Sequence, residues 1–240
     1  MTDAVSAGNP IDREGLSERI ATIRRRVATA AEASGRKPED ITIIGVSKTF
    51  PREMVTAAYG AGLRVFAENR VQEARDKFTE PLPQDACLHL IGHLQSNKVK
   101  LAVGLFSCIE SVDREGLVEA LEREAAKRDL IVPVLMQVNV AREAQKSGCD
   151  PNQAPLLLDL IASSPHLRCD GLMTIAPLVD DPEDARGTFR DLHLLREEFR
   201  QRHPMLPLDV LSMGMSGEFE VAIAEGATHV RIGRAIFGQR

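Results

Sequence analysis

The stretch ITIIGVSKTFP, residues 41–51, decides between two folds for this chain. Its first half contains Ile43, Ile44 and Val46, which are apolar, β-branched residues that pack well in a strand. A lysine, Lys48, follows, and a Phe-Pro pair then breaks the pattern. An open doubly wound sheet normally places a glycine-rich turn after its first strand, and GVSKTFP is not such a turn. The stretch therefore argues against the open sheet, and it leaves Lys48 as either a solvated strand end or a reactive amine.

Similar apolar runs recur along the whole chain. We expect eight strands, at 41–47, 63–67, 87–91, 105–109, 132–140, 167–173, 208–212 and 227–232. Helical stretches separate the strands, and this alternation indicates parallel strands with crossover helices. Eight such units in about 200 residues predict a closed (β/α)₈ TIM-type barrel.

The ends of several helices are also predicted. An extra N-terminal helix begins at Asn9-Pro10 and stops at Gly35. Later helices occupy 113–128, which opens on an aspartate cap, and 182–202, which starts at Asp181-Pro182; another begins near Gly217. We therefore expect a single α/β domain over residues 10–240, preceded by a flexible N-terminus at residues 1–9.

The composition of the chain argues against several classes of function. The chain has 240 residues and a formal net charge of −5, which gives no general attraction to nucleic acid or to an anionic membrane. There is no run of eighteen apolar residues, and the N-terminus lacks the apolar segment of a signal peptide. The four cysteines are widely spaced, without a metal-binding pattern. These features predict a cytoplasmic protein with no metal, nucleic-acid or membrane partner.

The residues that could carry chemistry follow from the barrel, whose working side chains lie at the C-terminal ends of the strands. Lys48 ends the first predicted strand, and the glycine- and serine-containing turns SMGMSGEF (212–219) and RIGRAIFG (231–238) follow the last two. Such turns suit a phosphate, although ordinary turns between a strand and a helix also favour these residues. Arg231 lies within a strand, so it needs either an anionic ligand or an inward-facing acid as partner. Together these residues indicate a phosphorylated aldehyde held as a Schiff base.

Six blocks of the sequence resemble one family. The blocks occur in this order: GVSKTFP, FAENRVQEA, HLIGHLQSNKVK, QVNVAREAQKSG, GLMTIAPL and LSMGMSGEFEVAIAEGATHVRIGRAIFG. The resemblance as a whole runs from about residue 11 to the C-terminus. They closely resemble the pyridoxal phosphate homeostasis proteins, which are single-domain relatives of the alanine racemase N-terminal barrel.

The resemblance implies pyridoxal 5′-phosphate (PLP) as cofactor, linked to Lys48 as a Schiff base. It implies a phosphate cradle at Ser212, Gly214, Ser216 and Gly233, a contact of Arg231 with the pyridine nitrogen, and a cofactor lining that includes Asn69 and Met173. This sequence also departs from the family pattern. Leu88 replaces a frequent tryptophan, and Arg234 replaces a frequent threonine, so a contact of Arg234 with phosphate and an exposure to solvent both stay open. The role of His93 is open as well.

The same residues bear on catalysis. An arginine at the pyridine nitrogen cannot give the ring the proton that makes it a strong electron sink. A racemase also needs a second acid/base group, which in alanine racemases is a tyrosine of a C-terminal domain, whereas the only tyrosine here, Tyr59, falls in the first crossover helix. We therefore expect no catalytic residue and a monomeric PLP carrier that serves PLP-dependent apoenzymes. The alternatives are a PLP-dependent amino-acid racemase or lyase, a cofactor-free Schiff-base aldolase, and a scaffold without chemistry.

Overall fold

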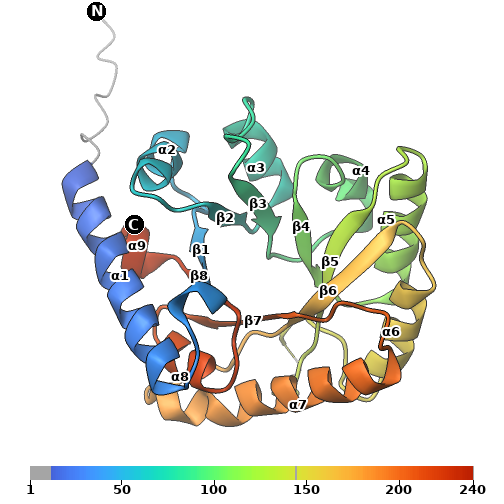
Figure 1. Ribbon diagram of the computed structural model, residues 1–240. Coiled ribbons are helices and arrows are strands. Elements are labelled where there is room, and N and C mark those ends of the chain that lie inside the picture. The colour runs from blue at the N-terminus through green and yellow to red at the C-terminus, as the bar shows by residue number, and fades with distance from the viewer. Residues whose placement is uncertain (1–11, 144, 240) are drawn as a thin grey trace, which may run out of the picture.

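The computed structural model describes residues 12–143 and 145–239. Within these residues, eight parallel strands pair in sequence order and close into a barrel (Figure 1). The strands are β1 (Thr42–Val46), β2 (Val65–Glu68), β3 (Cys87–Leu90), β4 (Cys108–Val112), β5 (Val132–Gln137), β6 (Leu167–Met173), β7 (Val210–Met215) and β8 (His229–Ile232). The pairing of β8 with β1, for example Arg231 beside Ile44, closes the ring. The predicted (β/α)₈ barrel is thereby confirmed.

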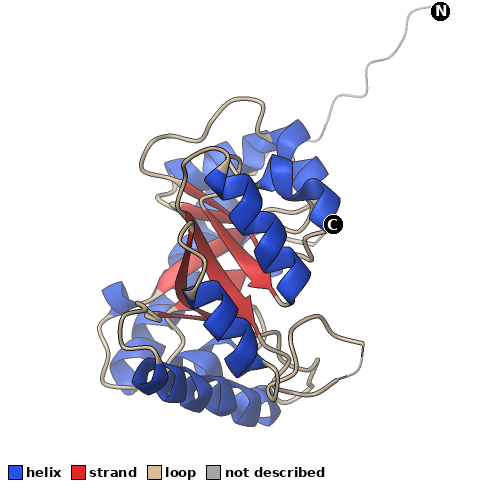
Figure 2. Cartoon of the chain, turned by 90° about the vertical axis from the view of Figure 1, so that its right-hand side faces the viewer, coloured by secondary structure: helices blue, strands red, loops and turns tan. Residues whose placement is uncertain are grey.

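Helices surround the strands, as Figure 2 shows from the side. They are α1 (Arg13–Ala33), α2 (Arg52–Gly60), α3 (Val71–Lys77), α4 (Val99–Ala102), α5 (Glu115–Ala126), α6 (Ala154–Ala162), α7 (Arg186–Arg202), α8 (Phe219–Ala224) and α9 (Arg234–Phe237), with short 3₁₀ turns η1 (Pro38–Asp40), η2 (Ser96–Lys98) and η3 (Pro182–Ala185). In the described part of the chain, no helix has both the length and the apolar composition needed to cross a membrane.

The extra N-terminal helix, α1, packs beside α8 and α9 (Figure 1). Asp12 caps its start, because the carboxylate accepts a hydrogen bond from the Gly15 N–H at 2.8 Å. A buried face at helical spacing holds it against the barrel: Leu16, Ile20, Ile23, Val27 and Ala31. The predicted start at Asn9-Pro10 and the predicted flexible segment 1–9 lie outside the described residues.

The barrel interior is lined by alternate residues of each strand. Most of the apolar core lies between strands and helices, while smaller clusters form separately, one from Ile44, Val46 and Ala67. Because side chains alternate along a strand, Lys48 continues the face of Ile44 and Val46 just beyond the strand end. This alternation explains how β1 can deliver a lysine to the mouth of the barrel.

Several predicted boundaries differ from the structure, among them those of the fourth strand, of the helix predicted at 113–128 and of the seventh strand. The fourth strand is β4 at Cys108–Val112, not 105–109, because the apolar Leu105 and Phe106 pack against the core from the preceding turn. Asp113 does not cap α5, since its carboxylate pairs with the Arg114 side chain at 2.7 Å and the helix starts at Glu115. The seventh strand continues past residue 212 to Met215, with an irregularity in its pairing with β8.

Candidate functional site

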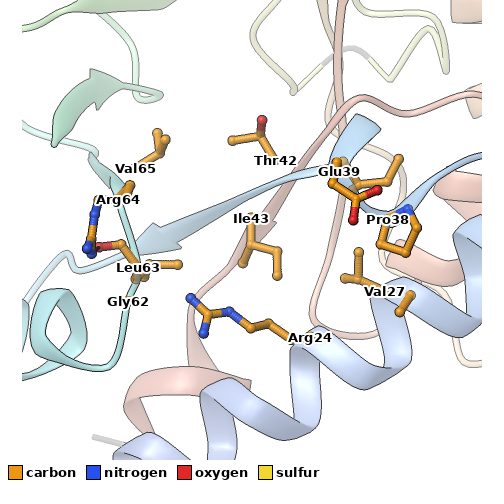
Figure 3. Close-up of a pocket in the computed structure, with 12 residues that line it drawn as sticks. Arg24, Val27, Pro38, Glu39, Thr42, Ile43, Gly62, Leu63, Arg64 and Val65 are labelled. Atoms are coloured by element: carbon orange, nitrogen blue, oxygen red, sulfur yellow. Dashed lines mark hydrogen bonds between the residues drawn. The ribbon is translucent and has the colours of Figure 1, made fainter. Parts of the chain in front are cut away.

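Two cavities lie at opposite ends of the barrel. One, of about 500 Å³, lies between α1 and the beginnings of β1 and β2; Figure 3 shows Arg24 of α1 extending toward Leu63 there. The other, of about 430 Å³, lies at the C-terminal ends of β1, β2, β7 and β8. The first is lined mainly by apolar and arginine side chains at the end where barrels do not place their chemistry, so the second is the candidate site. We call it the mouth cavity.

The mouth cavity brings together several predicted site residues. They are Lys48, Asn69, Ser216, Arg231 and Gly233, and Arg234 joins them on the wall. Sequence analysis missed other parts of the lining, which include Val46, Ile91, Ile175, Met215 and Glu218. Val46 could have been found, because it precedes Lys48 by two residues and therefore shares its face.

The other predicted residues lie outside the lining. Met173 is fully buried and packs with Cys108 and Leu135. Gly214 has a φ of +93°, and a Cβ there would lie 2.6 Å from the Cβ of Ala222, so the fold itself requires glycine where α8 packs on β7. Ser212 is also fully buried, and its hydroxyl takes part in an interior network.

That network fixes the Arg231 side chain from the barrel interior. One terminal guanidinium nitrogen donates to the Ser212 hydroxyl at 2.8 Å, and the other donates to the Thr174 carbonyl at 2.7 Å. The Ser212 hydroxyl in turn donates to Glu110 Oε2 at 2.6 Å. Glu110 Oε1 lies 2.7 Å from His89 Nδ1. Since β4 and β7 are not neighbours in the barrel, the bond between Ser212 and Glu110 crosses its interior.

The network also balances charge. Burial alone would raise the pKa of Glu110, but the hydrogen bond and electrostatic attraction between Glu110 and His89, together with the charge of Arg231, outweigh it, so the pKa is lowered and the carboxylate stays ionised. Burial lowers the pKa of Arg231, yet a guanidinium remains protonated at neutral pH. Arg231 thus has an inward acid as counter-charge and also lines the mouth cavity. Sequence analysis missed Glu110 because the fourth strand was placed three residues early.

Two turns form one side of the mouth cavity. The turn after β7 is closed by two bonds between Met215 and Glu218: the Met215 N–H donates to Glu218 Oε1 at 3.0 Å, and the Glu218 N–H donates to the Met215 carbonyl at 3.2 Å. A Cβ on Gly217 would meet no other described atom within 4 Å, and one on Gly233 would meet only Val46, at an ordinary 3.6 Å. The fold therefore does not need glycine at these two positions. Glycine does leave the backbone open to an anion in the cavity.

Asn69 supplies a further sign of a ligand. Its Oδ1 is buried and has no hydrogen-bond partner among the described residues. Leaving such an acceptor unpaired costs about 1–3 kcal/mol, which a donor group on a ligand would offset. An amine, a turn whose backbone is open to an anion, a buried cation and an unpaired acceptor together fit a phosphorylated aldehyde.

Of three other residues of interest, Tyr59 and His93 lie off this site and Arg234 lies on its wall. Tyr59 is on α2, where its hydroxyl donates to Asp85 at 2.7 Å. His93 is exposed, 3.9 Å from Asp113, and lines a separate cavity that shares Asn69 with the mouth cavity. Arg234 is exposed and also lines the mouth cavity. Its side chain therefore has room either to contact a phosphate in the cavity or to extend into solvent.

Comparison with known proteins bears on the family of this chain. Residues 18–240 match the family model described as alanine racemase, N-terminal domain. The chain is similar to the pyridoxal phosphate homeostasis protein of Aquifex aeolicus, with 42% identity over 93% of this chain and 97% of the relative. It is similar in structure to PipY of Synechococcus elongatus with PLP bound, with a TM-score of 0.82 and 37% identity over 93% of this chain and 100% of that one. The crystal structure of an unknown protein from Bifidobacterium adolescentis is also similar, with a TM-score of 0.88 and 34% identity, over 95% of this chain and 97% of that one. The chain therefore belongs to the alanine racemase N-terminal domain family, and within it to the pyridoxal phosphate homeostasis proteins.

Proposed function

We propose that this protein binds PLP in the mouth cavity, as a Schiff base on Lys48, and acts as a carrier in intracellular PLP homeostasis. The observation that carries the proposal is the joint presence of Lys48 and two glycine turns that the fold itself does not require. The solved relative PipY, described with PLP bound, supports it. In the linkage, the Lys48 amine adds to the aldehyde carbon, a C=N bond forms, and the aldehyde oxygen leaves as water.

Different residues of the chain would contact different parts of PLP. Ser216 and the backbone at Gly217 and Gly233 would hold the phosphate, because they form the open turns of the cavity. Arg231 would face the pyridine nitrogen, and Asn69 would accept a hydrogen bond from the ligand. Met173, Ser212 and Gly214, which the sequence predicted as contacts, would support the site from behind.

A carrier fits these residues better than a racemase. Arg231 donates hydrogen bonds and keeps its own proton, so it would leave the pyridine ring a weak electron sink. Tyr59 is bonded to Asp85 and does not line the cavity, so it offers no second acid/base group there. We also propose a monomer in the reducing cytosol that passes PLP to apoenzymes. Its cysteines are all unpaired thiols, in line with that compartment.

The test is an absorbance spectrum after incubation with PLP, followed by borohydride reduction and peptide mapping. We expect a Schiff-base band and a phosphopyridoxyl group on Lys48. Both should vanish in Lys48→Ala and persist in the control Lys100→Ala, which alters an exposed lysine of α4. A colourless wild-type protein would contradict the proposal. Rapid α-proton exchange on amino acids would instead establish the racemase or lyase alternative.

A further inference from the structure

Lys48 lies in a tight turn with an unfavourable backbone. The Phe50 N–H donates to the Ser47 carbonyl at 3.0 Å, which closes a four-residue turn with Lys48 second and Thr49 third. Thr49 has a φ of +68°. Turns with a positive φ at the third position prefer glycine, and a β-branched residue there is a rare outlier. Something outside the turn must therefore hold this conformation.

Two side chains of α3 form hydrogen bonds with the backbone on both sides of Lys48. Lys77 Nζ donates to the Ser47 carbonyl at 2.8 Å, and the Thr49 N–H donates to Glu73 Oε1. Glu73 and Lys77 are one helical turn apart and lie 3.3 Å from each other. The Lys77 side chain is 8% exposed and that of Glu73 is 28% exposed, so this ion pair is partly shielded from water. The carbonyl before Lys48 and the N–H after it are thus both fixed by α3.

A buried acid of β2 connects these contacts to the barrel wall. Glu68 of β2 is fully buried, and its Oε1 accepts hydrogen bonds from the Ser47 hydroxyl and from Lys77 Nζ, both at 2.7 Å. Neither Glu68, Glu73 nor Lys77 lines the mouth cavity. They can therefore act on a ligand only through the Lys48 turn.

We propose that Glu73 and Lys77 form a clamp that holds the strained Lys48 turn and so positions the Lys48 amine to react with PLP. This proposal rests on the proposed function, since it concerns the same site. In this role both are positioning residues, because they touch the backbone of Ser47 and Thr49 on either side of Lys48 and do not line the cavity. The clamp should govern formation of the covalent linkage more than the non-covalent hold on the phosphate and ring.

The first test separates those two steps. In Glu73→Ala and Lys77→Met, the rate constant for appearance of the Schiff-base absorbance at saturating PLP should fall by about tenfold or more, because small displacements of a reacting group are costly. Affinity for pyridoxine 5′-phosphate, which has no aldehyde, should change by less than about twofold. The control is Arg128→Met. Arg128 lies at the opposite end of the barrel and, like Lys77, pairs with an acid and donates to a backbone carbonyl, since it pairs with Glu124 and donates to the Lys100 carbonyl at 2.6 Å. This variant should leave both readouts unchanged.

The second test asks whether the strained turn is the target. Glycine accepts a positive φ without steric cost, so Thr49→Gly should restore most of the linkage rate to Glu73→Ala. Asp129→Gly, at another residue with a positive φ of 52°, should not. A wild-type protein that forms no linkage would overturn the proposed function itself. Wild-type rates in both clamp variants would overturn only the clamp, as would a loss of linkage and pyridoxine 5′-phosphate binding together without rescue by glycine.

Discussion

Replacing Glu110 by glutamine tests whether this buried carboxylate balances the charge of Arg231 inside the barrel. The change removes one buried charge and keeps the shape of the side chain. The amide oxygen can still accept from the Ser212 hydroxyl, and the amide nitrogen can face His89 Nδ1, so both existing 2.6–2.7 Å contacts keep a partner. Arg231, which is 4% exposed, would lose the fully buried carboxylate that balances it.

The expected cost follows from that loss. Removing one partner of a buried ion pair costs about 3–5 kcal/mol, because the other charge stays buried without compensation. Glu110 reaches Arg231 through the Ser212 hydroxyl and not by direct contact, so we expect the lower end, about 3 kcal/mol in the free energy of unfolding. That loss corresponds to a shift of about a hundredfold in the unfolding equilibrium.

Urea unfolding followed by circular dichroism measures this cost in Glu110→Gln, in Arg231→Met and in the double variant. If the two charges depend on each other, the double variant should lose about 1–3 kcal/mol less than the sum of the single variants. The exposed change Lys100→Ala should cost less than about 0.5 kcal/mol. Additive losses, within about 0.5 kcal/mol, would refute the reasoning that Glu110 balances Arg231.

Three further predictions concern burial and backbone geometry. Burial lowers the pKa of His229 to about 4, so between about pH 6.5 and 4 the unfolded chain binds more protons than the folded one. Stability should therefore fall by up to about 3 kcal/mol as pH drops through this window, and urea titrations of His229→Gln should lack that part of the loss. Burial raises the pKa of the Cys169 thiol to about 12, so mass spectrometry after iodoacetamide treatment at pH 8 should find the partly exposed Cys87 alkylated well before it. Gly214→Ala should lower stability by about 2 kcal/mol or more, measured as a drop in Tm, because alanine would need a φ of +93° and would collide with Ala222; an unchanged Tm would show that the turn relaxes freely.

The order of strands was predictable because its signals are local. Short β-branched runs, glycine and proline breaks and helical spacing each depend on a few neighbouring residues, and together they set the (β/α)₈ sequence. The same locality let Lys48 and Arg231 be placed at the mouth, since the C-terminal ends of all parallel strands meet there. Side-chain direction in β7 was not predictable. The pairing of β7 with β8 is irregular between Ser212 and Met215, which breaks the simple alternation that sequence reasoning assumes.

The misplaced fourth strand and the missed Glu110 have a single physical cause. An acid inside a strand normally indicates a solvent-facing position, so the apolar run LFSCI is the stronger strand pattern by sequence, whereas CIESV forms β4. The barrel reverses this expectation because Arg231 needs a counter-charge wherever it is buried. Glu110 supplies that charge from across the interior, and Ser212 relays it. The acid Glu110 makes β4 hard to recognise from the sequence, and the same acid balances the charge of Arg231 at the mouth cavity. Substitution of Glu110 should therefore act mainly through Arg231.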